Sequence, residues 1–251
     1  MDNARLVDTI RIMMSEEHLS AYILPLNDEG EMKVVTAADE KGFDCGLDKL
    51  TEWLSDQLKD VRNPEVALDG MCHTEMSVRR LVTLLRNAGG MTLRTNLGLS
   101  SRWLNMAGIA EEAAAPMSPM ASTDNLSPHE RVKLLRANLR KVHADGMLMT
   151  LPEAISHVIG YQVPVTKYIF PAEAYLLVDS QRATLYIDRR CVTADILSVL
   201  LNEGIGLGDL SDVRKGLREY FEYNILLDPN EVSHTLFHSV ERIIVEDSVK
   251  V

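Results

Sequence analysis

The sequence contains few of the residues that mark disulfide-stabilised, membrane-spanning or secreted proteins. Among 251 residues there are only three cysteines, Cys45, Cys72 and Cys191. They form no C-x-x-C pair, which argues against a disulfide framework or a zinc ribbon and favours reduced thiols. No apolar run approaches the roughly 20 residues that span a bilayer, and the N-terminal residues mix charged with apolar side chains, unlike a signal peptide. We therefore expect a cytoplasmic protein without a membrane partner.

Positive charge is also scarce. Lys and Arg total 26 against 37 Asp and Glu, which gives a formal net charge of −11. Such a surface repels phosphate backbones, and no basic run offsets it, so we expect no nucleic-acid partner. What the chain does have is a globular composition, with 46% hydrophobic and 25% charged residues. Its length predicts one large domain or two smaller ones with ordinary apolar cores.

A change of composition divides the chain. Residues 107–126 are rich in Ala, Ser and Pro and have no apolar period, which is typical of a linker that cannot offset its ordering entropy. We therefore predict a first domain at 1–106, a linker at 107–126 and a second domain at 127–251. The second domain opens with a capping box, in which Ser127 is the N-cap, Pro128 the first helical residue and Glu130 the third.

Both halves show helical and strand patterns in a similar order. The elements predicted in the first half are helices at 2–17, 47–58 and 74–87 and strands at 21–24, 66–68 and 91–95. Those predicted in the second half are strands at 147–150, 174–179, 184–188, 224–228 and 243–246 and helices at about 127–142, 151–159, 193–203, 211–221 and 231–240. The shared order predicts an α/β fold of two related domains, each a mixed β-sheet flanked by helices. The first domain is expected to be a trimmed copy that lacks residues found around the hairpin at 174–188.

Several segments resemble a known family. Leu19–Pro25 followed by Asp28 resembles the first strand and loop of the aminopeptidase P (Xaa-Pro aminopeptidase) family, and residues 65–103 resemble the end of its first domain. Residues 129–162, 172–188 and 224–251 resemble its second domain. The chain therefore looks like the two N-terminal, creatinase N-like domains of that family, for which the resemblance implies a creatinase/prolidase, ribonuclease H-like fold.

The resemblance also bears on function. In the family a further C-terminal domain of pita-bread fold carries two Asp, one His and two Glu that bind two divalent metals, with manganese expected. The chain stops about where that domain would start, so we expect no catalytic, cofactor-binding or metal-binding residue here. The hypothesis is a non-catalytic module for self-association or docking to a catalytic aminopeptidase domain. The alternatives are a fragment or subunit of a two-metal Xaa-Pro aminopeptidase and a small-molecule sensor.

Four groups of residues have patterns that occur in functional sites, and for each we favour a structural interpretation. His234 and His238 have a helical i, i+4 spacing that suits a metal, but the H-E-x-x-H signature is missing. Cys72 and His73 are sequence neighbours, whose side chains point apart. The glycines of residues 204–208 resemble a phosphate loop but follow a helix, and we interpret them as a loop between two helices. Asp179 and Asp188 are carboxylates at the ends of a predicted hairpin, where turn residues are common.

Overall fold

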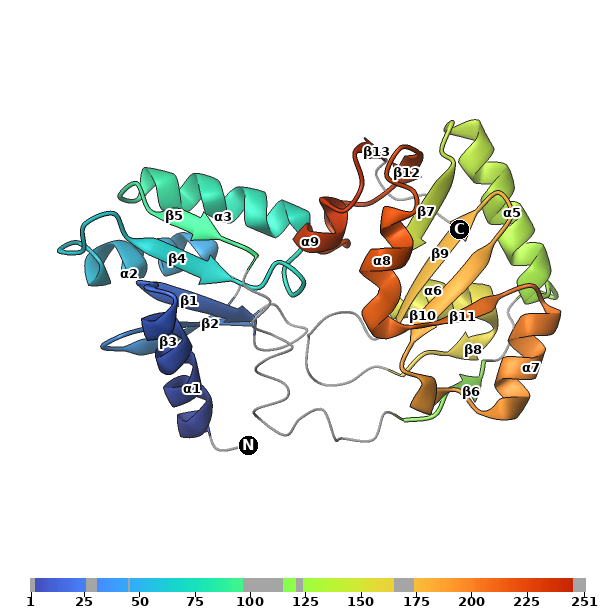
Figure 1. The fold of residues 1–251 in the computed structure, drawn as a ribbon, viewed down its shortest axis with the longest axis horizontal. Helices are drawn as coiled ribbons and strands as arrows, with labels where there is room; N and C mark the ends of the chain where they lie inside the picture. The colour runs from blue at the N-terminus through green and yellow to red at the C-terminus, as the bar shows by residue number, and fades with distance from the viewer. Residues whose placement is uncertain are drawn as a thin grey trace. The chain divides into compact units, whose positions relative to one another are not determined.

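The computed structural model describes residues 3–25, 31–44, 46–96, 115–120, 124–164 and 174–245. They form two compact units. The first comprises the described residues up to 96 together with Ser233–Thr235, and the second comprises the remainder. Each unit is a mixed β-sheet flanked by helices, which confirms the predicted fold class (Figure 1). None of the described helices is long and apolar enough to cross a membrane.

The first unit is built on a five-stranded sheet with the order β3-β2-β1-β4-β5. Its strand β1 pairs antiparallel with β2 and parallel with β4, and β4 pairs parallel with β5. The elements are α1 (Asn3–Glu16), β1 (Ala21–Pro25), β2 (Glu31–Thr36), β3 (Glu40–Asp44), α2 (Leu47–Gln57), β4 (Glu65–Leu68), α3 (Glu75–Asn87) and β5 (Thr92–Arg94).

Both faces of this sheet are covered. Successive side chains of a strand point to opposite faces, and in the central strands the side chains on both faces are apolar. In β1, Ala21 and Ile23 pack with side chains of α2 and α3. Tyr22 and Leu24 belong to a separate cluster with α1. Figure 1 shows α1 and the α2–α3 pair on opposite faces of the sheet. The near-continuous apolar run of β1 is thus explained by burial on both faces.

The second unit has a six-stranded sheet with the order β11-β10-β9-β7-β12-β13. Two short strands, β6 and β8, pair separately. The elements are β6 (Ser118–Pro119), α5 (Pro128–Lys141), β7 (Gly146–Met149), α6 (Pro152–Ile159), β8 (Tyr161–Gln162), β9 (Ala174–Asp179), β10 (Ala183–Ile187), a 3₁₀ turn (Arg189–Cys191), α7 (Ala194–Asn202), β11 (Gly206–Asp209), a 3₁₀ turn (Leu210–Asp212), α8 (Val213–Arg218), β12 (Asn224–Leu226) and β13 (Arg242–Ile244). The short helix α9 (His234–Phe237) begins with two residues that are assigned to the first unit and ends with two of the second.

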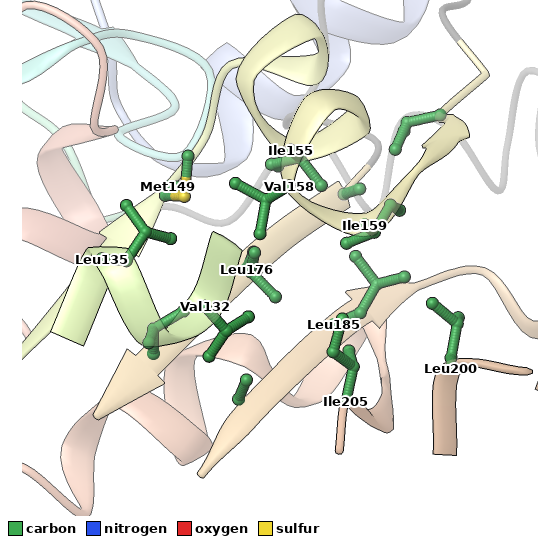
Figure 2. Packing of buried hydrophobic residues seen from close by; sticks show 14 of the residues in the cluster. Val132, Leu135, Met149, Ile155, Val158, Ile159, Leu176, Leu185, Leu200 and Ile205 are labelled. Carbon is green, nitrogen blue, oxygen red and sulfur yellow. The ribbon is translucent and has the colours of Figure 1, made fainter. Parts of the chain in front are cut away.

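The main core of the second unit lies between its sheet and the helices α5, α6 and α7. Figure 2 shows Leu135 of α5, Ile155 of α6 and Leu176 of β9 among the side chains of this cluster, and all three are almost fully buried. Helix α5 begins with the predicted capping box: the Ser127 side chain accepts from the Glu130 backbone N–H, and the Glu130 carboxylate accepts from the Ser127 N–H. That prediction is confirmed.

The two sheets share one strand order, with β1, β2, β3, β4 and β5 of the first unit matching β7, β9, β10, β12 and β13 of the second. The hairpin Ala174–Ile187 therefore has a counterpart in Glu31–Asp44. The second unit has elements on both sides of this hairpin that the described part of the first unit lacks, including α6 and β8 before it and β11 and α8 after it. The expectation that the first domain is a trimmed copy, which lacks residues around the hairpin, is confirmed. The strands β2 and β3 were missed because charged residues, among them the ion-paired Lys33 and Glu40, interrupt their apolar alternation.

Two further expectations need correction, and the linker prediction is not among them. The glycine-rich residues 204–208 are not simply an interhelical loop, because Gly206–Asp209 forms an edge strand parallel to β10. The helix expected at 231–240 is confined to His234–Phe237. The predicted linker lies largely outside the described residues, but within its described part Ser118–Pro119 pairs with β8 and Met117 is buried. Backbone pairing and one apolar anchor therefore order this part despite its composition.

One glycine of α8 is required by packing. A Cβ added at Gly216 would lie 2.7 Å from Cζ of Tyr186, which is a buried side chain of β10. We predict that Gly216→Ala lowers the free energy of unfolding by about 1–3 kcal/mol through overpacking. Gly206→Ala is the matched control, because its Cβ would meet only ordinary contacts at 3.7 Å and beyond. Urea unfolding of both variants tests this, and equal stability of the two would contradict the packing.

Candidate functional site

A polar cluster of the first unit forms where the chain leaves β4. Asp69 is buried at the carboxyl end of this strand, and its Oδ1 accepts from the Met71 N–H at 2.9 Å. Its carbonyl accepts from the Cys72 N–H at 3.0 Å, and the Gly70 N–H donates to the Thr95 carbonyl at 3.0 Å. These bonds fix a tight loop at the edge of the sheet where ligands bind in open α/β folds.

The buried imidazole of His73 follows this loop. One ring nitrogen bonds to the backbone of Ile23, so it carries the proton, while Nε2 makes no hydrogen bond within the described part of the chain. Burial lowers the pKa of His73 to about 4, and the charge of nearby Asp69 and the Ile23 bond oppose this only in part. His73 is therefore neutral at physiological pH, with its Nδ1–H donating to the Ile23 carbonyl.

The segment Ser233–Thr235 pairs with the loop after β4. Thr74 and Ser233 form an antiparallel bridge. The His234 N–H donates to the His73 carbonyl at 2.9 Å, and the Thr235 N–H donates to the Gly70 carbonyl at 3.0 Å. A side chain at Gly70 would lie 2.7 Å from Thr235 Oγ1 and 2.9 Å from the Thr95 carbonyl, so this close approach requires glycine.

Glu75 connects this segment to helix α3. It is the first residue of α3, after the N-cap Thr74, and only 2% of its side chain is exposed. Its Oε1 accepts from Arg79 Nε at 2.6 Å, and its Oε2 lies 2.6 Å from His234 Nδ1. A buried carboxylate is stabilised here by a guanidinium, an imidazole and the positive end of a helix. Chemically, the group combines a fixed anion with a half-buried imidazole that can donate, accept or bind a metal.

The histidine and cysteine candidates from the sequence are placed as follows. His234 is half-buried against Glu75, whereas His238 is exposed and its ring contacts that of Phe237. Cys72 is partly exposed, and the adjacent His73 is buried and bonded to Ile23. Nothing in the sequence marked Glu75 as a partner of His234, because the two residues are 159 positions apart.

Asp179 and Asp188 do not meet. The antiparallel register pairs Val178 with Ala183 and Ala174 with Ile187, so one aspartate is at the turn and the other follows the opposite end of the hairpin. Asp179 accepts from the backbone of Gln181 and Arg182 at 2.5 Å each and from the Tyr220 hydroxyl.

The pKa of Asp179 is affected most by burial, which raises it. The Tyr220 hydroxyl, the two backbone bonds and Arg182 together outweigh burial and lower the pKa. The pKa of Asp188 is lowered by its hydrogen bonds to Arg190, where it caps a 3₁₀ turn. Both carboxylates therefore have local structural partners.

No protein-family model and no curated protein sequence matches this chain. Among solved structures, the X-prolyl aminopeptidase of Caenorhabditis elegans, described as a cytosolic enzyme with a di-nuclear active site, matches 99% of this chain at 13% identity with a TM-score of 0.75. This chain covers 51% of that protein, about half its length. Aminopeptidase P of Streptococcus thermophilus matches 48% of this chain and 92% of its own at 16% identity, with a TM-score of 0.35.

The nematode match defines the fold. Both described units belong to the mixed α/β architecture found in an Xaa-Pro aminopeptidase, which confirms the fold that the sequence resemblance implied.

The buried state of His73 leads to a prediction about pH. An unfolded chain takes up a proton at this histidine below its ordinary pKa of 6.5, whereas the folded chain resists until about 4. Stability should therefore fall with decreasing pH across this window, by about 2 kcal/mol between about pH 7 and pH 5. Denaturant unfolding of wild type and His73→Asn at both pH values measures this contribution. We expect His73→Asn to lose this pH-dependent contribution. The control His143→Asn, at an exposed position, should keep it. Identical pH dependence in all three proteins would show that His73 is not buried in its neutral form.

Proposed function

We propose that this chain is a non-catalytic module of an Xaa-Pro aminopeptidase system, acting in the cytoplasm through self-association or docking to a catalytic aminopeptidase domain. The observation that carries the proposal is the match of nearly all of this chain to about half of the nematode enzyme. Peptide hydrolysis would then depend on a catalytic domain, either joined to this module or supplied by a partner.

The potential metal ligands among the described residues support a non-catalytic role for this chain. A pair of divalent ions in hydrolytic enzymes is held by several carboxylates and an imidazole that surround both ions. Among the residues that the structure describes, neither unit by itself brings together three or more such side chains. Neither unit therefore provides the five-ligand, two-metal set that the family resemblance implies. We therefore derive no hydrolytic step through metals bound to this chain.

Exposed apolar side chains of the second unit support a role in binding a partner. Leu201 is 55% exposed on α7, and Tyr223 is 53% exposed just before β12. Aromatic and large aliphatic residues contribute most at protein interfaces, although single exposed apolar residues are also common on monomers. Because the chain has a net charge of −11, a partner whose surface carries excess positive charge would associate with it faster.

A direct prediction concerns activity. The purified chain should not cleave a proline-containing peptide at the Xaa-Pro bond, with or without added Mn²⁺, because the required ligand set is expected on another domain. The assay is mass spectrometry of the peptide after incubation, with an intact Xaa-Pro aminopeptidase as the positive control. Cleavage that elutes with this chain through two purification steps, in proportion to its concentration, would contradict the proposal.

Association is tested separately by size-exclusion chromatography with light scattering. We expect a dimer or larger species, or a complex with an added catalytic aminopeptidase domain. A strict monomer that binds no such domain would contradict a role in self-association or docking.

A further inference from the structure

We propose that two copies of this chain associate through the edge strand β11 of the second unit, with the two β11 strands pairing antiparallel about a twofold axis. The proposal rests on the self-association proposed above and names the surface that mediates it. Every residue that carries it belongs to the second unit. Among the described residues, β11 pairs with β10 on one side and with no strand on the other (Figure 1).

The free side of β11 has no feature that blocks pairing. An edge strand can extend its sheet through the N–H and C=O groups that point away from its neighbour, and proteins usually prevent this with Lys, Pro or a bulge. The strand Gly206–Asp209 has the sequence Gly-Leu-Gly-Asp and pairs with β10 residue by residue, without a bulge. In contrast, the edge strand β3 of the first unit carries Glu40, Lys41 and Asp44 within its five residues.

The charges of β11 do not oppose self-pairing. Its one charged residue is Asp209, whose Oδ1 lies 2.9 Å from Nε of Arg189. When all four residues pair antiparallel with those of a second copy, Gly206 faces Asp209 of the second copy. The two Asp209 residues are then three positions apart, or about 10 Å. Because each carboxylate has a guanidinium partner and salt screens charges at this distance, two copies can pair here despite the net charge of −11.

Apolar side chains next to β11 add to the surface that a second copy would cover. Helix α7 contacts β11, and its Val199 and Leu201 are 40% and 55% exposed. Leu207 of β11 is only partly buried against the core. In a twofold interface the same patch is used by both copies, so each of these side chains is buried twice. An identical strand also offers as many backbone donors and acceptors as the edge itself presents, which favours a second copy as the occupant.

The primary experiment is sedimentation velocity of the full chain over a concentration series, combined with amide hydrogen exchange to locate the contact. We expect a dimer, with exchange of residues 206–209 slowing as the concentration rises. Gly206→Lys should raise the dimer dissociation constant at least about tenfold, because it places a charge in the edge. A Cβ at Gly206 meets only ordinary contacts, at 3.7 Å and beyond, so the change should not disturb folding. The matched control is Gly42→Lys on the edge strand β3, where a Cβ meets nothing within 4 Å; it should associate as the wild type does.

Leu201→Glu is the second variant, because it removes an apolar contact and adds a negative charge beside β11. Its matched control is Leu134→Glu on α5, at a position that is 52% exposed. We expect only Leu201→Glu to weaken the dimer, and urea unfolding of all four variants checks that each is folded.

An unchanged dissociation constant in both Gly206→Lys and Leu201→Glu, or an equal increase in the control variants, would overturn the β11 interface and leave self-association through another surface. A strict monomer would also overturn it, whereas docking to a catalytic domain is decided by the binding assay above. The β11 interface and the proposed function can therefore fail separately.

Discussion

The structure around the candidate site depends on backbone pairing between two segments far apart in the chain. Ser233–Thr235 extends along the loop that follows β4, through the Thr74–Ser233 bridge and the amides of His234 and Thr235. This pairing is feasible because Gly70 has no side chain. It also places His234 against the buried carboxylate of Glu75, whose charge would be costly to bury without a partner. Without the pairing, the ion pair of Glu75 and His234 would not form.

The sheets of the two units share one strand order and differ in the strands added to it. A central strand with an antiparallel hairpin on one side and two parallel strands on the other occurs in both, and the second unit adds β11 at its edge beyond β10. Packing of β11 and α8 against β10 requires glycine at two positions. A Cβ at Gly208 or at Gly216 would collide with the Tyr186 ring. The glycines of this region are therefore explained by packing around one buried tyrosine, and the phosphate-loop interpretation is not needed.

Features that depend on local sequence could be predicted. The capping box of Ser127 and Glu130 and the apolar strand Ala174–Asp179 are encoded by near neighbours, and they formed as expected. The hairpin Glu31–Asp44 was missed because its stability comes from cross-strand contacts, including the Lys33–Glu40 ion pair, which leave no clear period. The helix expected at 231–240 is short because backbone pairing to the loop after β4 competes with helical hydrogen bonds at its start.

The candidate site was less accessible to sequence reasoning. The contact between Glu75 and His234 was not visible, since no local pattern connects Glu75 with a residue 159 positions away. The burial of His73 was equally hidden, because the residue stands in a polar stretch between Cys72 and Thr74. Such contacts follow from the tertiary fold, which the resemblance to Xaa-Pro aminopeptidases suggested only in outline.

Amide hydrogen exchange at His234 and Thr235 tests the central pairing most directly. Both N–H groups donate to carbonyls of the first unit, those of His73 and Gly70, so they should exchange much more slowly than unstructured amides. The predicted result is protection comparable to that of neighbouring strand amides in β4. Exchange of both amides at the rate of an unfolded peptide, in a chain whose β4 amides remain protected, would contradict the pairing and the site built on it.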